Sequence, residues 1–66
     1  MVIYKTYLVT YQAYYWDVNK PAKILQEKIE IGVDEDMTNG KIAEALQENI
    51  KGGNIKTAFV INFWEM

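Results

Sequence analysis

The sequence predicts an α+β domain in which a three-stranded sheet carries one helix on one face. Segments 2–16, 23–33 and 55–66 are rich in β-branched and aromatic residues, which is typical of strands. One stretch between them, 38–51, has apolar residues at helical spacing instead. The predicted order is therefore β-β-α-β. A chain of 66 residues has room for one core only, so we expect a single domain, 1–66.

The first strand is predicted to lie at the centre of the sheet. It contains no glycine or proline, and Lys5 is its only formal charge before Asp17. Asp17, Asn19 and Pro21 then indicate a hairpin loop, because proline cannot donate to a sheet ladder. The first strand has two alternating faces. One consists of Ile3, Tyr7, Val9, Tyr11, Ala13 and Tyr15, and the other of Val2, Tyr4, Thr6, Leu8, Thr10, Gln12, Tyr14 and Trp16.

The second strand has one apolar and one polar face. Leu25, Ile29, Ile31 and Val33 alternate with polar residues and a glycine, which predicts that one face contacts solvent.

The helix follows the acidic run 34–36 and is predicted to begin near Thr38. Either Thr38 or Asp36 can cap its first amide groups, and Gly52 and Gly53 favour its termination after Lys51. Acidic residues near its start would suit the helix dipole. Its apolar stripe consists of Ile42, Ala45, Leu46 and Ile50.

The connection rules of sheets predict the strand order. A right-handed crossover through the helix makes the second and third strands parallel, with a gap between them. The first strand fills this gap antiparallel to both, giving a mixed or antiparallel sheet of order 2-1-3. We expect the helix stripe to pack against Tyr7, Val9, Tyr11, Ile29, Ile31, Val33, Phe59, Ile61 and Phe63.

The opposite face of the sheet is the candidate binding surface, because a single helix cannot cover both sides. Tyrosine and tryptophan are enriched at interface hot spots. The alternative is an ordinary solvated face stabilised by cross-strand aromatic pairs. A bulge in the first strand would instead move Tyr14 and Trp16 toward the core. We expect this face to display Ala58 and the six candidate binding residues Tyr4, Leu8, Tyr14, Trp16, Val60 and Trp64.

The outer strands offer another route to association. Both would present unpaired backbone groups at a sheet edge. The run 58–64, AFVINFW, has no charge and no proline, so it is suited to pairing with another chain.

Composition argues against several classes of function. The chain has no cysteine and no histidine, so we expect no disulfide, zinc site or histidine-based catalysis. The acidic run lacks the spacing of a calcium loop, and no glycine-rich phosphate motif is present. We expect no metal, no cofactor and no enzymatic activity. A net charge of −2 without a basic run makes nucleic acid an unfavourable partner. No signal-like or membrane-spanning stretch is apparent, which favours a cytoplasmic protein.

The sequence therefore predicts a non-enzymatic protein–protein interaction module that forms a homodimer, binds another protein, or both. Small domains without disulfides or metals commonly gain stability by associating. Abundant isoleucine, lysine and asparagine and the lack of arginine resemble coding by an AT-rich genome, which is compatible with a phage-type or mobile-element inhibitor or adaptor of a host protein. The alternative is weak single-stranded nucleic-acid binding through the sheet aromatics.

Overall fold

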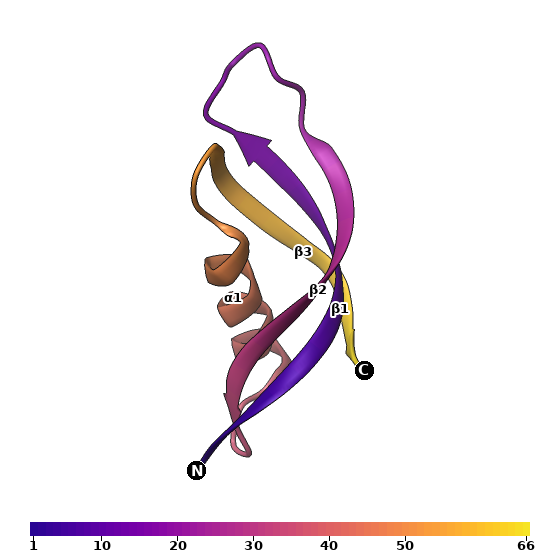
Figure 1. Ribbon diagram of the computed structural model, residues 1–66, viewed down its shortest axis with the longest axis vertical. Helices are drawn as coiled ribbons and strands as arrows, with labels where there is room; N and C mark the ends of the chain where they lie inside the picture. Colours follow the sequence, from indigo (N-terminus) through magenta and orange to yellow (C-terminus); the bar gives the residue numbers. More distant parts are fainter.

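The computed structural model describes all 66 residues and confirms the predicted α+β class (Figure 1). Strands β1 (Val2–Tyr15) and β2 (Lys23–Asp34) form a long hairpin, followed by helix α1 (Asn39–Ile50) and strand β3 (Ile55–Glu65). The sheet order is β2-β1-β3, with β1 antiparallel to both neighbours. The predicted element order and sheet order are therefore both confirmed.

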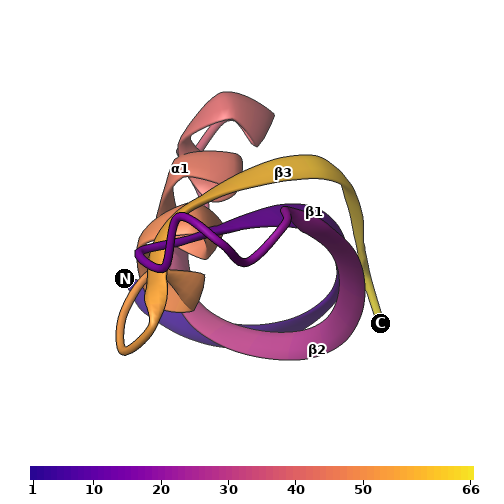
Figure 2. The ribbon, with the colours of Figure 1, turned by 90° about the horizontal axis from the view of Figure 1, so that it is seen from above.

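The sheet is twisted and curls on one side of α1, as seen from above in Figure 2. The molecule is elongated, with extents of 42 × 17 × 16 Å, and the β1–β2 hairpin extends beyond the end of the helix (Figure 1). We call the face toward α1 the inner face and the opposite one the outer face. Because α1 is much shorter than the sheet, part of the inner face has no helix above it.

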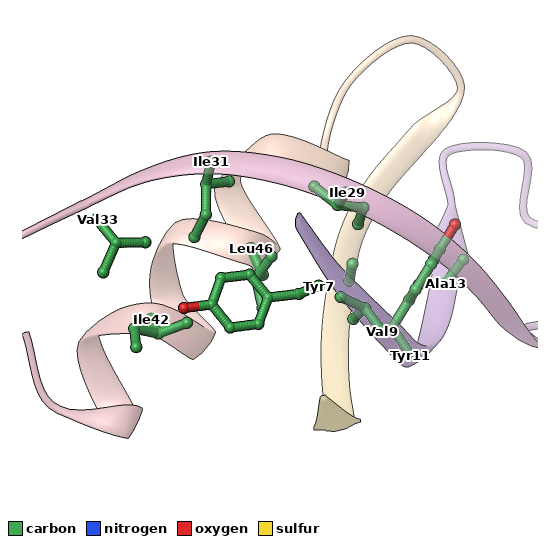
Figure 3. Packing of buried hydrophobic residues seen from close by; sticks show 10 residues of the cluster. Tyr7, Val9, Tyr11, Ala13, Ile29, Ile31, Val33, Ile42 and Leu46 are labelled. Atoms are coloured by element: carbon green, nitrogen blue, oxygen red, sulfur yellow. The ribbon is translucent and has the colours of Figure 1, made fainter. Parts of the chain in front are cut away.

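The core lies between α1 and the inner face. Leu46 and Val9 are fully buried at its centre, and the Tyr7 ring packs edge-on against Phe63 with ring centroids 5.7 Å apart. Figure 3 shows Tyr7 extending toward the helix residues Ile42 and Leu46. Burial of this apolar surface is the main source of stability in so small a domain. The ten buried residues are Tyr7, Val9, Tyr11, Ala13, Ile29, Ile31, Val33, Ile42, Leu46 and Ala58.

The ends of α1 follow the predicted capping signals. The Thr38 hydroxyl accepts a hydrogen bond from the Lys41 amide at 3.3 Å, and so satisfies one of the free donors of the first turn. Gly52 and Gly53 follow the helix with positive φ angles of 147° and 57°, which side-chain-bearing residues rarely adopt. The helix starts at Asn39, beyond the acidic run 34–36, and its first turn contains no acidic residue.

The predicted facing of β3 is wrong for residues 57–60, which lie between two register shifts, one at Ile61 and one at Lys56, whereas Ile55 packs against the core as predicted. Tyr11 pairs with Val60 while Thr10 pairs with Asn62, so Ile61 is an additional residue without a partner on β1. Ala58 is buried and Val60 packs against the core, whereas Phe59 and Ile61 are 62% and 48% exposed. Phe63, beyond the bulge, keeps the predicted inward position. Both irregularities therefore lie in β3 and not in the first strand.

Tyr11 makes the stability of the fold sensitive to high pH. Burial of the ring, which is 3% exposed, and the neighbouring Glu27 carboxylate together raise the pKa of Tyr11 from 10.0 to about 12. Below pH 10 both folded and unfolded chains keep the phenolic proton. Between pH 10 and 12 only the unfolded chain loses it, so the free energy of unfolding should fall by about 1.4 kcal/mol per pH unit.

The variant Tyr11→Phe should lack this contribution. Urea unfolding of both proteins at pH 8, 10 and 11.5 measures the difference, and Tyr4→Phe, at an exposed ring, serves as the control. An equal loss of stability in Tyr11→Phe and in the unmodified chain would contradict the assignment.

Candidate functional site

The outer face carries two groups of apolar side chains, and we treat it as the candidate functional site. Cross-strand pairing places residues of β2, β1 and β3 in rows across this face. One row is Ile24, Gln12 and Phe59, and another is Lys28, Leu8 and Trp64. Residues distant in the sequence therefore meet here because of the register of the sheet.

The first group, which we call the hairpin-end cluster, consists of Tyr14, Trp16, Ile24 and Phe59. Their exposed fractions are 42%, 63%, 65% and 62%, respectively. Phe59 lies diagonally across from Tyr14, within the distance at which aromatic side chains of neighbouring strands interact. The Trp16 backbone amide donates to the Asn54 carbonyl at 3.2 Å, which ties the start of the hairpin loop to the start of β3.

Polar contacts hold two rings of the hairpin-end cluster in place. The Tyr14 hydroxyl donates to Gln12 Oε1 at 3.2 Å. Lys56 Nζ lies 5.6 Å from the centroid of the Trp16 ring, within the range of a cation–π interaction. These aromatic side chains thus have defined positions although much of their surface is free, which lowers the entropic cost of binding.

The second group, the central pair, consists of Leu8 and Trp64. They are cross-strand partners, with Leu8 partly buried and Trp64 49% exposed. A polar row of Gln26, Thr10 and Asn62 separates them from the hairpin-end cluster, and Gln26 Nε2 donates to Thr10 Oγ1 at 3.3 Å. The outer face is therefore apolar in two areas with a polar row between them.

Tyr4 lies apart from both groups. It is ten positions from Tyr14 on the same strand, which corresponds to about 33 Å. Its cross-strand partner is Gly32, and a Cβ atom built at Gly32 would be 3.6 Å from the Tyr4 ring. The Tyr4 ring thus covers Gly32, which has no side chain. Its role is therefore local packing within the sheet.

Val60 does not belong to the outer face, in contrast to the prediction. The bulge at Ile61 turns it toward α1, where it packs against the core and its backbone amide donates to Gln47 Oε1 at 3.1 Å. Of the six predicted binding residues, Tyr14, Trp16, Leu8 and Trp64 thus fall into the two groups, while Tyr4 and Val60 do not.

Phe59 and Ile24 are outer-face residues that the sequence prediction did not include. Phe59 was assigned to the core because both parities of the run 58–64 are apolar, so alternation carries no information on its phase. The small side chain of Ala58 is the sequence feature that could have indicated the correct phase. Ala58 pairs with Ala13, and both residues are buried. Two small side chains permit a close approach, which favours Ala58 over Phe59 on the inner face.

The charged groups form isolated surface pairs. Lys5 Nζ lies 3.1 Å from Glu65 Oε1, the terminal ammonium of Met1 lies 3.6 Å from Asp34, and no three acidic side chains are grouped to hold a metal ion. No helix has the length and apolarity needed to cross a membrane. The apolar groups of the outer face are thus its distinguishing feature.

Comparison with known proteins finds no relative of this chain. No protein-family model matches the chain, and no curated protein or solved structure is significantly similar to it.

Proposed function

We propose that the protein is a non-enzymatic interaction module that forms a homodimer through the outer face of its sheet. The exposure of the hairpin-end cluster together with Trp64 carries this proposal. Large, rigid aromatic side chains that are held by local contacts are the usual anchors of protein interfaces. Small sheet domains also gain the apolar burial they lack by packing on a second copy.

The proposal extends to a partner in a host cell. A dimer of a small acidic domain presents two copies of any remaining surface, which suits an inhibitor or adaptor that acts by occupying a site on a larger protein. The AT-rich residue composition supports a phage or mobile element as the source.

Sedimentation of the purified chain from micromolar to millimolar concentration tests self-association. We expect the mass to rise from 7.7 kDa toward twice that value. Tryptophan emission should shift to shorter wavelength over the same range, because Trp16 and Trp64 leave water. A chain that stays monomeric at millimolar concentration, with unchanged emission, would contradict the proposal.

A further inference from the structure

We propose that a groove on the inner side of the sheet binds an extended segment of a basic partner protein, which adds as a strand to the free edge of β3. The groove has a volume of about 770 Å³ and lies between the N-terminal part of α1, at Asn39, Gly40 and Ile42, and residues 60–65 of β3. Trp64 borders both the groove and the outer face, but the free backbone edge of β3 is not part of the proposed homodimer interface, so the two proposals can fail independently.

The groove has an apolar floor and one wall made of strand. Tyr7, Ile42 and Phe63 supply apolar surface, and residues 60–65 of β3 follow one another along one side. Asn62 and Trp64 line the groove although they pair on the outer face. This pattern indicates that the backbone of β3 forms the wall. In Figure 1 this end of β3 runs away from α1.

The backbone of this wall has free hydrogen-bonding groups. The Met66 amide donates to the Thr6 carbonyl at 2.9 Å, so Met66 points its backbone groups toward β1. Backbone groups alternate along a strand. Phe63 and Glu65 therefore direct their N–H and C=O groups to the open edge, where an added strand can pair with them.

The rest of the β3 edge is less accessible. The Val60 amide is already bonded to Gln47 of α1, and Ile55 is bridged to Gly52 through backbone hydrogen bonds of 2.9 and 3.3 Å. The open part of the edge thus begins after Val60, which is the part that lines the groove. One short segment of a partner protein can therefore pair with the edge of β3 and fill the groove at the same time.

The charges around the groove favour a basic occupant. Asp34, Glu35 and Glu65 line it, against Lys5 as the one cationic side chain. Lys5 is bound to Glu65 and the terminal ammonium of Met1 lies 3.6 Å from Asp34, so Glu35 is the lining carboxylate that has no ion pair. An extended segment with lysine or arginine beside apolar residues matches both the unpaired Glu35 carboxylate and the apolar floor.

A second copy of the chain is a poorer match. Its β3 has no cation after Lys56 and would bring a further Glu65 toward the carboxylates of the groove. Its β2 has a neighbouring loop with Pro21 and carries charges of both signs, which are features that protect an edge from pairing.

Titration of the ¹⁵N-labelled protein with a defined peptide tests the proposal. The probe is an acetylated and amidated octapeptide of alternating valine and lysine. Its two comparison peptides replace lysine by glutamate, or carry N-methyl groups on alternate amides. We expect the probe to shift the amide signals of Phe63 and Glu65, and each comparison peptide to bind at least tenfold more weakly.

Two charge-reversal variants complete the experiment. Glu35→Lys should weaken binding of the probe at least threefold, whereas Glu48→Lys, at an exposed helix carboxylate outside the groove, should leave it unchanged. The proposal is overturned by no shift at millimolar peptide, by equal binding of the glutamate peptide, or by shifts confined to the outer face or to β2. Concentration-dependent shifts of Phe63 and Glu65 without peptide would assign the groove to a second copy and also overturn it.

Discussion

Replacement of Leu46 by alanine should remove a large part of the free energy of unfolding of this protein. Leu46 is fully buried at the contact between α1 and the sheet, and leucine-to-alanine changes at such sites cost about 2–5 kcal/mol. A domain of 66 residues has a total stability of roughly 3–10 kcal/mol. Loss of this one side chain should therefore remove roughly half of the free energy that keeps the chain folded.

Leu25→Ala is the matched control, since it is the same chemical change at a side chain that is 36% exposed. We expect it to cost less than about 1 kcal/mol, because surface substitutions rarely exceed this value. Urea unfolding followed by circular dichroism measures both variants. Both variants should be compared at micromolar protein concentration, because self-association would add stability at higher concentration. Similar losses at Leu25 and Leu46 would mean that α1 does not form the core contact.

The arrangement of elements was predictable because each one has a distinct local signal. The composition of residues 2–16, the helical stripe and its Thr38 cap each indicate one type of structure. The crossover rule then leaves few sheet orders. Local preference and global topology agree in this chain, which is the condition under which sequence reasoning succeeds.

The facing of β3 was not predictable from alternation, and the candidate site changed as a result. A bulge of one residue at Ile61 reverses the parity of β3 as far as the second register shift at Lys56. In a strand with a polar face, such a shift would place polar side chains in the core and be noticed. Here Phe59, Val60 and Ile61 are all apolar, so either phase satisfies the pattern, and the observed phase places Val60 against the core with its backbone amide bonded to Gln47 of α1.

The division of the outer face into two groups is also a property of the register. Alternation alone places Tyr4, Leu8 and Tyr14 on one face, but it does not place them in one patch. The pairing of β1 with Gly32 at one end and with Phe59 and Ile24 at the other gives each ring different neighbours. The sequence therefore predicted residues of the surface but not its boundaries.

The triple variant Tyr14→Ala, Trp16→Ala and Trp64→Ala should abolish self-association. All three rings are 42–63% exposed, and truncation of an aromatic anchor at an interface commonly costs about 2 kcal/mol or more. The dissociation constant should rise at least about a hundredfold, even if the three losses are far from additive. Sedimentation over the micromolar to millimolar range measures this change.

Two further variants separate loss of the interface from loss of the fold. Val18→Ala removes apolar surface at a hairpin-loop residue that is 94% exposed, and it should associate as the unmodified chain does. Trp64→Lys keeps a long side chain and places like charges close together in a face-to-face dimer, so it should give a folded monomer.

The triple variant also loses cross-strand contacts of about 0.2–1 kcal/mol each, so its circular dichroism must be checked at the same time. A folded Trp64→Lys protein that still dimerises with unchanged affinity would show that Trp64 lies outside the interface, and if the folded triple variant also associates normally, the outer face is not the surface through which the protein acts.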